Sequence, residues 1–223
     1  MAGFNMELRN TFLFLSSILL SFDSIDSAKS LDEDANKTIT LTSKTLGDVA
    51  LGQVKAKELP RAIKAFLDTI AAAEGTVITN HHCSRDAGYR SIVGCNLSAE
   101  NLFTDYETHP NISKSVGKNL RSDAAGRYQI LSSTWNWVAP KIGVSDFYPE
   151  TQDRIAQWLI NYRGAMKFIE RIGQNNYSSF KKAIYQLNNE WASLPGSPYG
   201  QRTREMQALW QVYQESYRVY GLR

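Results

Sequence analysis

Apolar side chains recur at helical spacing over most of the chain from residue 59 onward, and this pattern constrains the fold more than any other feature of the sequence. The first such stretch follows Pro60, ends near Gly75 and has its apolar positions three and four residues apart, at Ile63, Phe66, Leu67 and Ile70. The same spacing predicts further helices around residues 132–138, 149–162, 180–187 and 206–217. We therefore expect a mostly helical protein with a hydrophobic core.

Residues 77–107 break the helical pattern. Short β-prone runs, at 77–79, 89–93 and 102–106, are separated by glycines and polar stretches. Such runs are typical of a small antiparallel sheet, which makes α+β the predicted fold class. No internal repeat is visible, so a solenoid is excluded.

The N-terminal 57 residues differ from the rest. Residues 11–22 form an apolar run that is too short for the ~20 residues of a membrane-spanning helix, and we interpret residues 1–28 as a secretory signal. The polar residues 29–57 are predicted to be a flexible linker or arm, which leaves 58–223 as the catalytic domain. We expect an exported protein of the periplasm or cell surface, with no stable membrane span in the mature form.

Charge and cysteine content further limit which partners and which kinds of site the protein can have. The 25 lysines and arginines exceed the 22 acidic residues only slightly, and a net charge of +3 gives no argument for a nucleic-acid partner. In an exported protein Cys83 and Cys95 can form a disulfide. The alternative is a metal site with His81, His82 and His109, but the spacing matches none of the common zinc patterns, so no metal is expected.

Glu74 lies on the apolar face of the first predicted helix, because it follows Ile70 by four positions and Leu67 by seven. Apolar neighbours and the negative end of the helix dipole both favour the protonated carboxyl group, so we expect its pKa to be raised. A carboxyl group that is still protonated near neutral pH suits a general acid for glycosidic bond cleavage. The spacing also allows a side chain that turns into solvent beyond the helix end.

Several motifs occur in a fixed order along the compact region. They are Ala73-Glu74-Gly75-Thr76, Gly88-Tyr89 with Ile92-Val93-Gly94, Leu102-Phe103-Thr104-Asp105-Tyr106 with His109-Pro110, Ala125-Gly126-Arg127-Tyr128-Gln129, and Trp191-Ala192-Ser193-Leu194-Pro195-Gly196 with Tyr199-Gly200-Gln201. In this order the motifs resemble the endolysin family of phage lambda, over residues 60–215.

The resemblance implies a lysozyme-like fold with the small sheet beside an active-site cleft. It also implies a lytic transglycosylase of peptidoglycan, which cleaves the β-1,4 bond between N-acetylmuramic acid (MurNAc) and N-acetylglucosamine (GlcNAc) without water and leaves a 1,6-anhydro ring. Glu74 would be the single catalytic acid, protonating the leaving oxygen and then accepting the proton of the muramyl C6 hydroxyl. Peptidoglycan strands are the expected partner, no cofactor is expected, and the protein is expected to be a monomer.

Two other functions remain open at this point. A hydrolytic muramidase needs a second carboxylate, and Asp105 or Glu107 is the nearby candidate, although Asp105 is also suited to capping a turn. A catalytically inactive glycan-binding module would keep the cleft while Glu74 serves the structure. The intact motifs around Glu74 and Gln129 favour an enzyme.

The resemblance also suggests which residues contact the glycan, since sugar clefts combine aromatic faces with fixed polar groups. Arg127 itself is expected to have a structural role, in an ion pair or a carboxylate network. Trp191 and Tyr106 are candidates both for stacking against sugars and for the core. The complete set of expected substrate-binding residues is Tyr89, Tyr106, Tyr128, Gln129, Asn189, Trp191, Ser193 and Tyr199.

The chain departs from the family pattern in its N-terminal extension, its two cysteines and added residues at 96–101. The helix around Trp158 also lacks the polar character of the family's cleft-side helix. These features are compatible both with a chromosomal wall-remodelling enzyme and with a phage endolysin that has its own export signal.

Overall fold

The computed structural model describes residues 58–77, 81–95, 101–117 and 120–222. The expected signal segment at 1–28 and the linker at 29–57 lie outside the described residues, as do the added residues 96–100. In the described part of the chain, no helix has both the length and the apolar character that crossing a membrane requires.

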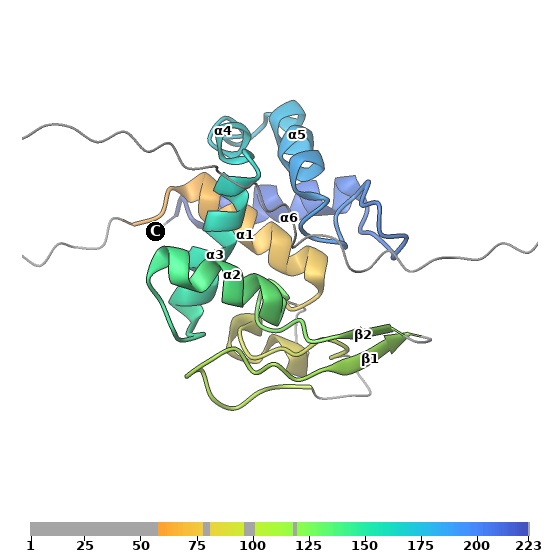
Figure 1. The fold of residues 1–223 in the computed structure, drawn as a ribbon. Helices are drawn as coiled ribbons and strands as arrows, with labels where there is room; N and C mark the ends of the chain where they lie inside the picture. The colour runs from red at the N-terminus through yellow and green to blue at the C-terminus, as the bar shows by residue number, and fades with distance from the viewer. Residues whose placement is uncertain (1–57, 78–80, 96–100, 118–119, 223) are drawn as a thin grey trace, which may run out of the picture. The chain divides into compact units, whose positions relative to one another are not determined.

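Helices dominate the described region, and they confirm the helical predictions from the apolar spacing. They are α1 (Arg61–Glu74), the short 3-10 helix η1 (His82–Gly88), α2 (Ser132–Ile142), α3 (Pro149–Tyr162), α4 (Met166–Ile169), α5 (Tyr177–Leu187) and α6 (Met206–Val219). Figure 1 shows the α-helices gathered together, with the two strands below α2.

The core forms where α1 packs against α5 and α6. Phe66 of α1 is fully buried, and its ring lies 6.0 Å from that of Phe180 and 6.5 Å from that of Tyr213, measured between ring centroids. Ile70 is also fully buried on this face. Burial of these apolar side chains fixes the direction of α1 in the fold. It therefore also fixes the position in space of the C-terminal end of α1.

The sheet lies later in the chain than the sequence predicts. It is a two-stranded antiparallel hairpin of β1 (Lys114–Gly117) and β2 (Leu120–Ser122), in which Ser115 pairs with Arg121. The β-prone runs at 89–93 and 102–106 form only isolated bridges, such as Ser91 with Leu102. The sequence pattern does not predict this hairpin, because its strands are short and polar and lack the alternation that marks a half-buried strand.

Candidate active site

Glu74 is the last residue of α1, and its side chain is half-buried. Gly75 ends the helix in the left-handed conformation, with φ 75° and ψ 20°, which glycine adopts without strain. The Ser193 hydroxyl donates a hydrogen bond of 2.5 Å to Glu74 Oε1. The alternative in which Glu74 turns away into solvent is therefore wrong.

Burial raises the pKa of Glu74 from an ordinary value of 4.5 to about 7, because desolvation disfavours the charged carboxylate. Two smaller effects lower the pKa again: the hydrogen bond from Ser193 and the positive charge of Arg204. A group with this pKa exchanges protons readily at neutral pH, and the same two partners stabilise the carboxylate once the proton has left.

Arg204 is a site residue that the sequence analysis missed. Its Nε donates to the carbonyl oxygen of Ala73 over 3.1 Å, and its backbone N–H donates to the carbonyl oxygen of Ser193 over 2.9 Å. Arg204 thus holds the end of α1 and the loop of Ser193 together. No local pattern marks it, because it lies 131 residues from Ala73 in the chain.

The segment that joins α5 to α6 brings together three of the expected glycan contacts. Asn189 is exposed, Ser193 and Tyr199 are half-buried, and the Tyr199 hydroxyl donates to the carbonyl oxygen of Asn189 over 2.8 Å. Trp191 is only 4% exposed and donates from Nε1 to the carbonyl oxygen of Tyr128 over 3.0 Å. Trp191 is therefore a core residue that anchors this loop and has no face free for stacking.

The prediction that the Tyr128 side chain lines the cleft is wrong. Tyr128 is 1% exposed, and its hydroxyl donates to Asp153 Oδ1 over 2.6 Å. Its neighbour Gln129 is half-buried, has a φ of 46° and donates from Nε2 to the carbonyl oxygen of Gly126 over 2.9 Å. The left-handed backbone at Gly126 and Gln129 forms a tight turn, and adjacent residues of a tight turn point in different directions.

Tyr89 and Tyr106 are half-buried, and the hydroxyl group of each bonds to an acid of the protein. The Tyr89 hydroxyl donates to Asp153 Oδ1 over 2.8 Å, and its side chain lines a cavity of about 340 Å³ beside the first half of α1. The Tyr106 hydroxyl donates to the carboxylate of Asp86, and its ring packs on Phe103. Among the described residues, neither tyrosine forms a hydrogen bond with Glu74, and their expected contacts with a glycan stay predictions.

Arg127 belongs to the framework, as predicted. It is 8% exposed, and its Nη2 pairs with Asp68 Oδ1 over 2.6 Å while Nη1 donates to the carbonyl oxygen of Ala87. The carbonyl oxygen of Arg127 lies 2.6 Å from Thr76 Oγ1. This buried network therefore includes Thr76, which lies two residues beyond Glu74 in the chain.

Each of the two candidates for a second carboxylate accepts a hydrogen bond from another part of the protein. Asp105 Oδ1 accepts a hydrogen bond of 2.8 Å from the backbone N–H of Glu107, which confirms the turn-capping interpretation. Glu107 Oε1 accepts a bond of 3.1 Å from the Tyr148 hydroxyl. Both acids are exposed.

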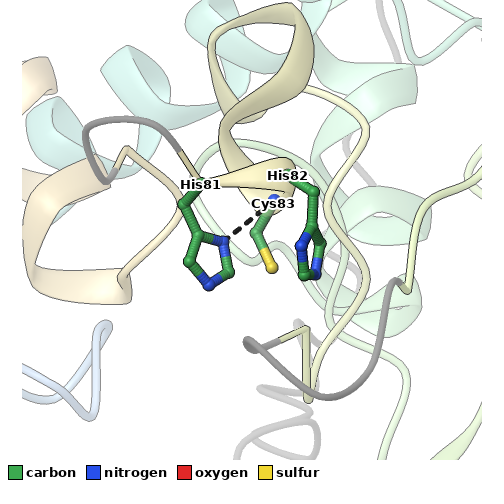
Figure 2. A group of neighbouring side chains, drawn as sticks. All are labelled: His81, His82 and Cys83. Carbon is green, nitrogen blue, oxygen red and sulfur yellow. Dashed lines mark hydrogen bonds between the residues drawn. The ribbon is translucent and has the colours of Figure 1, made fainter.

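Cys83 and Cys95 form a disulfide, with their Cα atoms 5.8 Å apart. Figure 2 shows His81 and His82 beside Cys83, and the potential ligand atoms of these three residues lie within 4.8 Å of one another. However, the sulfur of Cys83 is bonded to Cys95, and His81 Nδ1 already accepts a bond from the Cys83 backbone N–H. His109 is buried against the carbonyl oxygen of Ile130. The metal alternative therefore lacks its thiolate in this state.

Comparison with known proteins identifies the family. The family model described as Endolysin matches residues 64–218. The endolysin of Escherichia phage lambda is 38% identical over 159 residues, which cover 71% of this chain and 93% of that protein. The endolysin of Escherichia phage P2 is also 38% identical, over 156 residues that cover 68% of this chain and 90% of that protein.

A solved structure agrees with these relatives. The bacteriophage lambda lysozyme complexed with a chitohexasaccharide superposes with a TM-score of 0.63 at 38% identity, covering 71% of this chain and 96% of that one. The helices of the present chain, its small hairpin and Glu74 at the end of α1 are thus parts of a lysozyme-like fold. The chain belongs to the endolysin family.

Proposed function

We propose that this protein degrades peptidoglycan as a lytic transglycosylase, cleaving the MurNAc-β-1,4-GlcNAc bond with Glu74 as the only acid and base. The observation that carries the proposal is the state of Glu74: a half-buried carboxyl group with a pKa of about 7 and a single hydroxyl donor, at the end of α1. The complex of the related lambda lysozyme with a chitohexasaccharide, a chain of GlcNAc units, supports a glycan ligand.

The reaction uses one carboxyl group twice, first as an acid and then as a base. Protonated Glu74 donates to the bridging glycosidic oxygen, and the bond between that oxygen and C1 of MurNAc breaks. The resulting carboxylate, stabilised by Ser193 and the charge of Arg204, then accepts the proton of the C6 hydroxyl as its oxygen bonds to C1. Glu74 ends as it began, so the cycle needs neither water nor a second carboxylate.

The hydrogen bonds that Asp105 accepts from the Glu107 backbone and Glu107 accepts from Tyr148 support this route over hydrolysis. Ordinary glycosidases place two carboxyl groups about 5 to 9.5 Å apart, one of them free to act on water or on the sugar. Among the described residues, Glu74 interacts with Ser193 and with the charge of Arg204, and neither partner is an acid.

Mass spectrometry of the released fragments tests the reaction type. We expect MurNAc ends that are lighter by one water than hydrolysed reducing ends, and we expect Asp105→Asn to release the same fragments at an unchanged rate. Hydrolysed ends together with an inactive Asp105→Asn variant would establish the muramidase instead. Binding of peptidoglycan without any release would establish the inactive module.

We also propose that the protein acts outside the cytoplasm, in the periplasm or at the cell surface. The disulfide between Cys83 and Cys95 supports this, because disulfides persist in oxidising compartments. Fractionation of cells that express the full chain tests the proposal. Full-length protein that stays entirely in the cytoplasm would contradict it.

A further inference from the structure

Three aromatic side chains lie together on the outer surface of α2 and α3. Trp137 is 40% exposed, Tyr162 is 57% exposed, and Trp158 is half-buried. We call these three residues the aromatic patch. Exposed aromatic side chains forfeit the stabilisation of burial, and a cluster of them is typical of a binding surface.

The rings hold one another in place. Trp158 and Tyr162 are four residues apart on α3, and their rings are stacked with centroids 5.0 Å apart and an angle of 9° between the planes. Trp137 meets both rings edge-on, at centroid distances of 4.9 Å from Trp158 and 5.0 Å from Tyr162. Side chains that are already fixed by such contacts lose little freedom when a ligand binds.

The patch continues toward the loop of Ser193. Arg163, whose guanidinium lies 5.6 Å from the Tyr162 ring centroid, pairs with Glu190 over 2.8 Å. Glu190 directly precedes Trp191, which anchors the loop that holds Ser193 on Glu74. One ion pair thus joins the residue that follows Tyr162 to the residue that precedes Trp191, so the aromatic patch is tied to the proposed catalytic loop.

The charge beside the patch also fits one class of ligand. Glu190 neutralises Arg163, whereas Lys141, 5.8 Å from the Trp137 ring centroid, forms no ion pair with any residue that the structure describes. One free cation next to flat aromatic faces complements a sugar chain that carries scattered carboxylates. An anionic bilayer would instead favour several basic residues, since each adds only a small attraction.

We propose that the aromatic patch is an accessory binding surface for peptidoglycan strands, on which sugar rings stack and Lys141 meets a carboxylate of the wall polymer. The identity of the polymer rests on the proposed function, but the binding does not require catalysis. A short oligosaccharide occupies the site at Glu74 alone, whereas a long strand contacts both regions. The patch therefore contributes to the attack on intact wall and not to the chemical step.

The test measures sedimentation of the full chain with insoluble peptidoglycan, in a Glu74→Gln background that prevents digestion. Adding Trp137→Ala and Tyr162→Ala should weaken binding about tenfold, whereas Trp137→Phe with Tyr162→Phe, which keeps both rings, should retain it. Tyr148→Ala removes a comparably exposed tyrosine, 44% exposed, outside the patch and serves as the matched control. Lys141→Gln should reduce the salt dependence of binding.

The outcomes separate this proposal from the proposed function. With Glu74 intact, the patch double-alanine variant should cleave short soluble oligomers at the normal rate and lyse whole sacculi more slowly. Unchanged binding to peptidoglycan, or an equal loss in Tyr148→Ala, overturns the patch proposal even if cleavage is normal. Patch-dependent capture by phosphatidylglycerol vesicles, or patch-dependent dimers in sedimentation velocity, with unaltered peptidoglycan binding also overturns it. Absence of cleavage by the unsubstituted chain overturns the proposed function and leaves the binding result standing.

Discussion

Two regions beside α1 each hold a carboxyl group with a raised pKa, and the two groups differ in their hydrogen-bond donors. At the end of the helix, Glu74 has one hydroxyl donor, Ser193, and the charge of Arg204 nearby. Beside the first half of the helix, Asp153 accepts two tyrosine hydroxyls, and the charge of Arg127 also lowers its pKa. Burial is the largest cause of the raised pKa in both cases.

The difference lies in what each acid is free to do. Asp153 is held by two donors from neighbouring side chains, as expected of an acid that fixes a framework. Among the residues that the structure describes, Glu74 accepts from one hydroxyl, at Oε1, which leaves capacity to bind a proton or a substrate oxygen. We infer that the first region maintains the fold and the second performs the chemistry, and the following predictions test this division.

The largest effect is expected for Glu74→Gln. The amide keeps the shape of the side chain but has no acidic proton, so release of soluble fragments from peptidoglycan should fall by about 10²- to 10⁴-fold. Thermal unfolding should show a folded protein. A variant with more than a tenth of the normal rate would remove Glu74 from its proposed role.

Breaking the disulfide should act on the other region. The bridge closes the segment that includes Ala87 and Tyr89, both of which line the cavity near Asp153. Replacing Cys83 and Cys95 by alanine should lower the free energy of unfolding by about 3 kcal/mol, as measured by urea denaturation. At a temperature where the variant is folded, its activity should match the parent, and reductant should no longer affect it.

Arg127→Met should also reduce stability without affecting chemistry. The change leaves Asp68 without its ion-pair partner in a partly buried setting, which we expect to lower the free energy of unfolding by about 2–3 kcal/mol. The matched control is Arg218→Met, which breaks the exposed pair with Glu215 and should have a negligible effect. Equal effects of the two substitutions in denaturation curves would contradict the framework role.

The smallest effect is expected for Ser193→Ala. Catalysis needs protonated Glu74, so activity should decline as the pH rises through the Glu74 pKa of about 7. The Ser193 hydroxyl stabilises the carboxylate and lowers this pKa, so its removal should shift the alkaline limb of the kcat/KM profile upward by less than about one pH unit. A downward shift would mean that Ser193 favours the protonated form.

Local features of the sequence predict much of this architecture. The spacing of Phe66 and Ile70, followed by Gly75, is sufficient to predict α1, its buried face and its end. The position of Glu74 on that face follows from the same period, and burial then accounts for its raised pKa. Cys83 and Cys95 are close enough in the chain to suggest their pairing.

Features that depend on long-range packing cannot be predicted from local sequence patterns. Arg204 reaches Glu74 only because α6 packs along α1, and no local pattern indicates this. Tyr128 and Gln129 are neighbours in one motif, but only the tertiary structure determines that Tyr128 turns into the core toward Asp153. The sequence does not predict the pairing of β1 with β2, because these strands are too polar to give an alternating pattern.

The most direct test of the account is a carbon-13 NMR titration of the side-chain carboxyl groups in the full chain. We predict one glutamate with a midpoint near 7, whose signal is absent from the Glu74→Gln variant. A Glu74 midpoint near the ordinary value of 4.5 would contradict the claim that this half-buried carboxyl group carries the catalytic proton at neutral pH.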